Sequence, residues 1–238
     1  MEEHPEVKRF YREATAERGA DGWYVALDGR RVKTQGGNVL VLPNEASARL
    51  LADEWAAQGE EIDPGGFPMR DLADFALDVV APDREAAVAA LLRYAETDTL
   101  CYRADPDEPL WKRQQEVWEP LVTACEAREG IKLQRVSGVI HRAQDEAALA
   151  AFKARLEGMD YLSLGALTTL ASLAASLMVG LAALENDADG EALWDAANLE
   201  EDWQAERWGR DWEAEERRAK RRGDFLAAIA FAAALRAP

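Results

Sequence analysis

The spacing of hydrophobic positions changes along the chain, from short β-prone runs near the N-terminus to helical spacing beyond. Residues 23–27 and 30–34 are two such runs, separated by Asp28-Gly29. This dipeptide supplies the positive φ angles that a type I′ hairpin needs. A third run, 38–42, stops at a proline, so the pattern predicts a three-stranded meander. Such a small sheet needs another element to cover it.

Helical patterns surround and follow this predicted sheet. Residues 6–18 have the pattern of a short amphipathic helix closed by Gly19, and Asn44 is a good N-cap for a helix that runs to about Gln58. Residues 99–103 and parts of 131–143 have the pattern of short extended pieces, while 224–235 is compatible with helix or strand. Further helices are predicted over 70–80, 83–97, 107–130, 145–156, 160–184 and 189–221.

The change of pattern near residue 85 divides the chain into two predicted parts. We therefore predict an α+β fold with two domains. Residues 1–85 form a small β-rich domain, a β-meander plus helix, and residues 86–238 form a larger all-helical domain. A chain of 238 residues is long enough for this arrangement and for a substantial core.

Residues 161–184 carry no charge over 24 positions, a length that also suits a membrane span. A leucine stripe runs beside a stripe of small residues, which is typical of a central helix packed on several neighbours. Small residues at this spacing also occur in membrane dimers, so a membrane-anchored protein remains an alternative. Asp160 and Glu185 flank the segment where aromatic or basic residues would mark a span. We predict a buried helix without membrane insertion.

Composition restricts the class of partner. The net charge of −17 argues against nucleic acid and against anionic membrane surfaces, since both require basic patches. The cysteines Cys101 and Cys125 are far apart and form no CxxC pair, so neither a disulfide framework nor a zinc site is expected. The first residues contain no apolar signal-peptide core. We expect a cytoplasmic location.

The sequence contains no recognisable catalytic set. Phosphate-binding glycine loops and a GxSxG elbow are missing, and we expect no cofactor, no metal and no small-molecule substrate. We interpret His4 and His141 as surface residues, since neither has triad or metal partners near it in sequence. Paired carboxylates and tryptophans leave one enzymatic alternative, a small hydrolase with an acidic pair in a Trp-lined cleft.

Residues 198–222 are the most unusual segment, because tryptophans occur there among charges. Trp208 and Trp212 are four residues apart, so a continuous helix would place them on one face, with Trp203 preceding them. Aromatic residues mixed with arginine are typical of interface hot spots. The residues alone support two interpretations equally. The segment either packs on the helices of its own chain or binds a partner.

Several motifs resemble a known family, the ATP synthase alpha-subunit assembly chaperones of mitochondria and related bacteria. The most specific ones are TDTLCYR at 97–103 and LEEDWQAERWG at 199–209. Supporting motifs are RFYREA (9–14), DGRRVKT (28–34), LPNEASARLLADEW (42–55), WEPLV (118–122) and LASLAASLMVGLAAL (170–184).

The resemblance implies a non-enzymatic chaperone that holds the free alpha subunit of the F-type ATP synthase until its beta neighbour arrives. An acidic residue in the LEE part of the last motif matters in the family, which corresponds to Glu200 or Glu201. We expect Glu200, Glu201, Trp203, Trp208 and Trp212 to bind the partner. We expect Trp55, Tyr102 and Trp118 to be structural.

Overall fold

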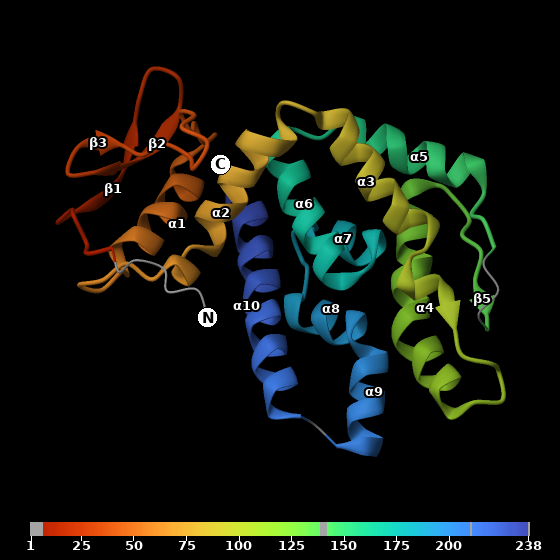
Figure 1. Ribbon diagram of the computed structural model, residues 1–238. Coiled ribbons are helices and arrows are strands. Elements are labelled where there is room, and N and C mark those ends of the chain that lie inside the picture. The colour runs from red at the N-terminus through yellow and green to blue at the C-terminus, as the bar shows by residue number, and fades with distance from the viewer. Residues whose placement is uncertain (1–6, 139–141, 210, 238) are drawn as a thin grey trace.

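A small antiparallel sheet lies at one end of the molecule, and helices make up most of the remainder (Figure 1). The computed structural model describes residues 7–138, 142–209 and 211–237. A sheet-containing N-terminal part followed by a mostly helical part confirms the predicted α+β class.

The sheet has the strand order β1-β2-β3, formed by Ala14–Arg18, Trp23–Leu27 and Arg30–Arg31. Asp28 and Gly29 connect β2 to β3 with φ angles of 48° and 75°, so the predicted hairpin is confirmed. The predicted strand over 38–42 is not one. That segment makes only isolated bridges, which join Val39 to Lys33 and Leu42 to Trp23.

The prediction of a helix over residues 6–18 is wrong, because the segment contains β1. The strand pairs along its whole length with β2, from Ala14 opposite Leu27 to Arg18 opposite Trp23. Ala14 and Ala16 pack against the core beside α1. Alanine and glutamate are good helix formers, but intrinsic propensity is a weak determinant, so pairing and burial decide the conformation.

The helices follow in an order close to the predicted one. Short 3₁₀ helices cover Pro64–Gly66 and Thr99–Cys101, and a π-helical turn covers Ala76–Val80. A second, two-stranded sheet pairs β4 (Tyr102–Arg103) in parallel with β5 (Val136–Ser137). The helices are α1 (Glu45–Ala56), α2 (Pro68–Phe75), α3 (Arg84–Glu96), α4 (Pro109–Glu129), α5 (Glu146–Glu157), α6 (Tyr161–Ala174), α7 (Leu177–Ala183), α8 (Gly190–Ala197), α9 (Leu199–Trp208) and α10 (Trp212–Leu235).

The uncharged segment 161–184 lies in the middle of the helical part, but as two helices. Ala175, with φ 49°, separates α6 from α7, and the Ser176 hydroxyl accepts a hydrogen bond from the amide of Val179 (3.1 Å). The hydroxyl of Thr99 donates to the Ala175 carbonyl (2.8 Å), so the break is satisfied from outside the helix. Among the described residues, no helix has the length and apolar character to cross a bilayer.

The predicted helix over 189–221 is also broken. It is divided at Asn198, between α8 and α9, and at Gly209, between α9 and α10. Gly209 has a φ of 89°, which a helix cannot contain. The segment 224–235, for which helix and strand were both open, is the second half of α10.

The last helix, α10, packs against both the sheet-containing part and the helical part of the fold. It packs against α1, α2, α6 and α8, so it borders both the sheet-containing part and the helical part (Figure 1). The side-chain amide of Asn44 caps α1 through its oxygen, and its nitrogen donates to the carbonyls of Ala234, Leu235 and Ala237 (2.9, 3.1 and 2.9 Å). A division at residue 85 stays a prediction about which parts fold separately.

Candidate partner-binding site

The five predicted partner-binding residues lie on α9 and at the start of α10, which we call the α9–α10 surface. These two helices meet at the lower end of the molecule in Figure 1. The surface consists of Glu200, Glu201, Trp203, Trp208 and Trp212. The structure brings all five into one region, although they do not share one helix face.

Trp208 and Trp212 are the most exposed tryptophans in the described chain, with 78% and 72% of their surface accessible. They are the last residue of α9 and the first of α10, on the two sides of Gly209. The expectation that they share a face of one helix is therefore wrong. Large exposed aromatic side chains at adjacent helix ends are suited to contact with another molecule, since water solvates indole poorly.

Trp203 differs from these two because its ring is partly covered. The guanidinium of Arg207, one turn further along α9, lies 4.3 Å from the ring centroid. The guanidinium of Arg113, from α4, lies 5.8 Å away. The contact with Arg113 joins α9 to α4, while Arg207 covers the ring from within α9. Of the three tryptophans, Trp203 is therefore the one whose ring is most covered by other side chains of the chain.

Glu200 and Glu201 are both exposed, and the Glu200 side chain contacts α4. The side-chain amide of the fully buried Gln114 donates to Oε1 of Glu200 (2.7 Å). Partial burial raises the pKa of Glu200, and the hydrogen bond from Gln114 opposes that rise. Gln114 also accepts from the amide of Ala104 (2.8 Å), so Glu200 is connected to the segment after β4.

Two ion pairs brace α9 on either side. Asp202 accepts a bidentate pair of hydrogen bonds from Arg218 of α10, one of them at 2.7 Å. Glu206 lies 2.7 Å from Nη1 of Arg113 on α4. The Asp202–Arg218 side chains are only 17% and 13% exposed, so this pair is the better shielded of the two.

Sequence reasoning did not identify Arg113, Gln114 or Arg218 as part of this region. Gln114 offered one signal, since it interrupts the apolar stripe of α4 between Leu110 and Trp118. A polar residue on a buried stripe needs hydrogen-bond partners. Arg113 and Arg218 offered none, because their partners are distant in sequence.

The three residues expected to be structural are not part of the α9–α10 surface. Trp55 is 9% exposed, and its carbonyl accepts from the hydroxyl of Tyr11 (2.5 Å). Trp118 is fully buried, and its Nε1 donates to the carbonyl of Ala196 at the end of α8 (2.7 Å). Tyr102 is half-buried in β4, opposite Val136.

A cavity of about 600 Å³ lies beside Trp194 and is the nearest approach to a Trp-lined acidic cleft. Three carboxylates line it, and two of them, Asp202 and Glu206, are ion-paired with arginine, while the third is Asp195. Carboxylates held in this way serve structure, so no observation favours the hydrolase alternative. His4 and His141 lie outside the described residues. Within the described chain, no three histidine, cysteine or carboxylate side chains form a metal-binding group.

Comparisons with known proteins all lead to one group. The family model described as ATP12 chaperone protein matches residues 8–126. Mitochondrial protein atp12 of Schizosaccharomyces pombe is 25% identical over 208 residues, which cover 82% of this chain and 72% of the relative. The crystal structure of Atp12 from Paracoccus denitrificans is 36% identical, with a TM-score of 0.90 over 97% of this chain and 99% of that one. A chaperone structure from Agrobacterium tumefaciens is 38% identical, with a TM-score of 0.93 over 98% of this chain and 88% of that one.

Proposed function

We propose that this chain, which belongs to the ATP12 chaperone protein family, binds the free alpha subunit of the F-type ATP synthase through its α9–α10 surface. Family membership supports the broader role, that of an assembly chaperone for the ATP synthase, and implies a protein without catalytic activity. In the proposed cycle the chaperone protects the alpha subunit until the beta subunit pairs with it. The fission-yeast relative is mitochondrial, and a cytoplasmic location for this chain remains a prediction.

The exposure of Trp208 and Trp212 is the observation that carries the proposal. Burying an indole ring on a partner removes a large apolar area from water, and tryptophan is among the commonest hot-spot residues. Here two rings flank one glycine turn, so a single partner patch can contact both. Together they supply the anchor of the proposed interface.

Charges at the other end of α9 supply orientation. The first turn of α9 carries Glu200, Glu201 and Asp202, and the last of these is already paired with Arg218. Glu201 is exposed and therefore open to a basic group of the alpha subunit. Charges at the rim of an interface mainly set register and the association rate, which suits a partner that is later released.

The experiment is a binding measurement with purified alpha subunit by calorimetry or pull-down. The Trp208→Ala/Trp212→Ala double variant should lose at least about tenfold in affinity, since each hot-spot residue contributes about 2 kcal/mol. Glu201→Ala should weaken binding with little loss of folding stability. Glu200→Ala should weaken binding and also cost about 1–3 kcal/mol of stability, because it leaves the buried amide of Gln114 without its acceptor.

Val79→Ala is the matched control, because Val79 is 57% exposed on the π-helical turn, outside the α9–α10 surface. Its affinity should equal that of the wild type. Wild-type affinity in the tryptophan double variant and in both glutamate variants would show that the alpha subunit does not bind at the α9–α10 surface.

A further inference from the structure

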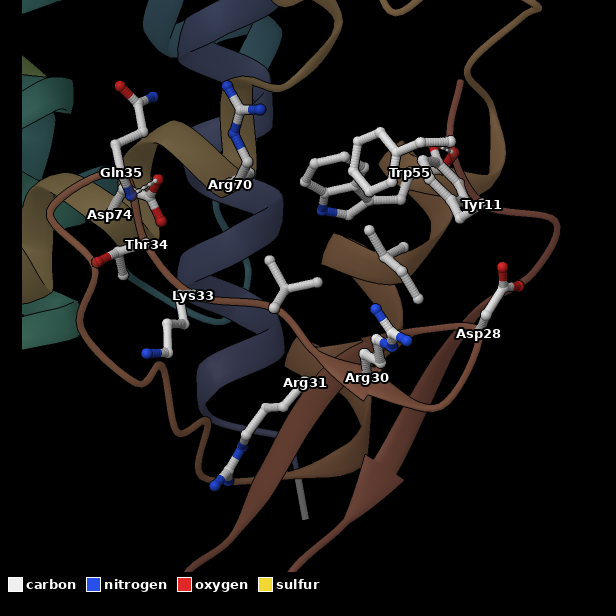
Figure 2. A pocket seen from close by; sticks show the side chains of 13 residues that line it. Tyr11, Asp28, Arg30, Arg31, Lys33, Thr34, Gln35, Trp55, Arg70 and Asp74 are labelled. Carbon is white, nitrogen blue, oxygen red and sulfur yellow. Dashed lines mark hydrogen bonds between the residues drawn. The ribbon is translucent and has the colours of Figure 1, made fainter. Parts of the chain in front are cut away.

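A second surface, at the free edge of the sheet, has different chemistry. A cavity of about 670 Å³ opens beside β3 and the segment that follows it, and Figure 2 shows its lining side chains. Four basic side chains contribute to it, from Arg30, Arg31, Lys33 and Arg70, against two carboxylates, Asp28 and Asp74. In a chain with a net charge of −17, this local excess of cations is a departure from the surrounding surface.

Two of the four cations are already engaged. Arg31 lies 2.9 Å from Asp21 and stacks over Tyr24, and Figure 2 shows its side chain turned away from Trp55. Arg70 pairs with Asp71 (2.6 Å) and stacks on Phe67 (4.0 Å to the ring centroid).

Arg30 and Lys33 are not engaged. Within the described residues, neither side chain has a hydrogen bond or an ion pair, and both are exposed. They lie three residues apart on the extended segment after the hairpin turn. Two uncommitted cations on one extended segment are suited to an anionic partner that runs alongside it.

An aromatic row forms the other wall of the cavity. Phe10 contacts Tyr11 edge to face at 5.3 Å, and Tyr11 contacts Trp55 in the same way at 5.5 Å. Tyr11 and Trp55 are buried, whereas Phe10 is 68% exposed at the open end of the row. Phe10 therefore offers an apolar contact next to the free cations.

The backbone beside these side chains is an unpaired sheet edge. The amide of Val32 donates to Val25 (2.9 Å), and the amide of Thr34 donates to Asn38 (3.0 Å). Because successive amides of an extended chain point to opposite sides, those of Arg31 and Lys33 point outward. In the described chain, no backbone hydrogen bond joins this outer side to another segment.

We propose that this edge surface, made of Phe10, Arg30, Val32, Lys33 and the outer backbone of residues 31–33, binds an extended acidic peptide segment of a partner protein as an added strand. The outward amides and carbonyls would pair with the peptide backbone, as in strand addition to other sheets. The free cations would bind acidic side chains, and Phe10 with Val32 would contact an apolar one. This site does not depend on the α9–α10 surface or on the identity of the client there.

The test uses a fluorescent nine-residue peptide with glutamates on both faces of its extended chain and a central phenylalanine, since Arg30 and Lys33 are three residues apart and lie on opposite faces of theirs. Its partner peptide has the same charge, with proline replacing two residues whose amides would face the edge. We expect the first peptide to bind the full chain and the proline peptide to bind at least about tenfold more weakly. Bound peptide should slow hydrogen exchange at the amides of Arg31 and Lys33.

The variant Arg30→Glu/Lys33→Glu should lower affinity by at least about tenfold, since it replaces two attractions with repulsions. Arg93→Glu/Lys112→Glu is the matched control, because it makes the same change of charge at exposed positions of α3 and α4. Circular dichroism checks that both variants fold.

Three results would overturn the proposal. Equal binding of the proline peptide would mean that charge alone attracts the peptide. Equal binding by the edge variant would place the contact elsewhere. No binding of the first peptide would leave Arg30 and Lys33 as charges that only protect the edge from self-association.

Discussion

The α9–α10 surface and the edge surface both expose aromatic rings beside charges, but they are built in different ways. Trp208 and Trp212 stand on two helices whose mutual position is set by side-chain contacts from residues distant in sequence. Phe10 and the free cations stand beside a hairpin whose shape is set by Asp28, Gly29 and the strand pairing. Geometry at the first surface therefore depends on the helical core, while geometry at the second is largely local.

The two regions also differ in the sign of the charge that they offer. The first turn of α9 is acidic, and the extended segment after β3 is basic. If both bind protein partners, each selects a segment of opposite charge. One small chain thereby presents two docking chemistries at once.

Removal of the Trp118 side chain should give the largest difference between the two surfaces in their binding. Trp118→Ala deletes a fully buried ring and its hydrogen bond to Ala196, directly before α9, and should cost about 3–5 kcal/mol of unfolding free energy in urea. Alpha-subunit binding should fall with it. Peptide binding at the edge should persist if the predicted division at residue 85 describes separately folding parts.

Trp118→Phe is the control for this change, because it keeps most of the ring and leaves the Ala196 carbonyl without its donor. It should cost about 1–3 kcal/mol. A loss below about 1 kcal/mol for Trp118→Ala would contradict the assignment of Trp118 to the core.

The next largest effect is a pH dependence in the region of the edge surface. Burial raises the pKa of Asp74 to about 6, although the amide of Gln35 donates to its carboxylate (3.0 Å). A raised folded-state pKa stabilises the fold fully below the unfolded value and loses that stabilisation as pH rises through about 6. Asp74→Asn should remove about 1–3 kcal/mol of pH-dependent stability between roughly pH 4 and pH 7. Urea titrations at several pH values measure it.

Asp78 is the matched control, on the same face as Asp74. Burial acts to raise the pKa of Asp78, but hydrogen bonds from Asn38, Thr34 and Gly36 outweigh it and lower that pKa. Its stabilisation is present above the unfolded pKa and is lost as the solution becomes more acidic. Asp78→Asn should therefore flatten the acid side of the profile, and the same slope change from both variants would refute this account.

A double-mutant cycle on Asp202 and Arg218 tests whether ion pairs support the α9–α10 surface. Each of Asp202→Asn and Arg218→Met should cost about 1–2 kcal/mol, between the values for exposed and buried pairs, because both side chains are largely covered. The coupling energy should be about 1 kcal/mol. Additive losses would mean that the two residues act separately.

The smallest effect compares two glycines. Gly209→Ala should destabilise by about 1 kcal/mol, since its φ of 89° disfavours a side chain although nothing lies near. Gly223, inside α10 and equally uncrowded, should give up to about 1 kcal/mol of stabilisation on change to alanine. Thermal unfolding of both variants measures the contrast, and effects of the same sign would contradict it.

Local chemistry made the hairpin predictable, because Asp28-Gly29 has few alternatives to a type I′ turn. Residues 14–18 were misread since their alanines and glutamates suit a helix, while pairing with β2 decides the outcome. The breaks at Ala175 and Asn198 were also missed. Ala175 carries no turn signal, and its carbonyl accepts a hydrogen bond from Thr99, which is 76 positions away in sequence.

For the candidate site, the charged tryptophan segment was visible in the sequence, but its geometry was not. Exposure of Trp208 and Trp212 follows from the turn at Gly209, whereas the sequence pattern had predicted one helix over 189–221. Partners such as Gln114, which is 86 positions from Glu200, are specified only by the tertiary fold. The edge surface was not foreseen, because residues 38–42 were predicted to be a strand of the meander following residues 30–34.

The bond network of Asn44 has a consequence for synthesis of the protein on the ribosome. Asn44 begins α1, yet its amide nitrogen needs carbonyls at the end of α10, 190 to 193 positions later. At about 5–20 residues per second, translation takes roughly 10–40 s to supply them. During that interval the nascent N-terminal segment lacks the helix that packs against α1 and α2, so its apolar face is open to other chains. Until its last helix emerges, the growing chain exposes apolar surface that α10 covers in the finished fold.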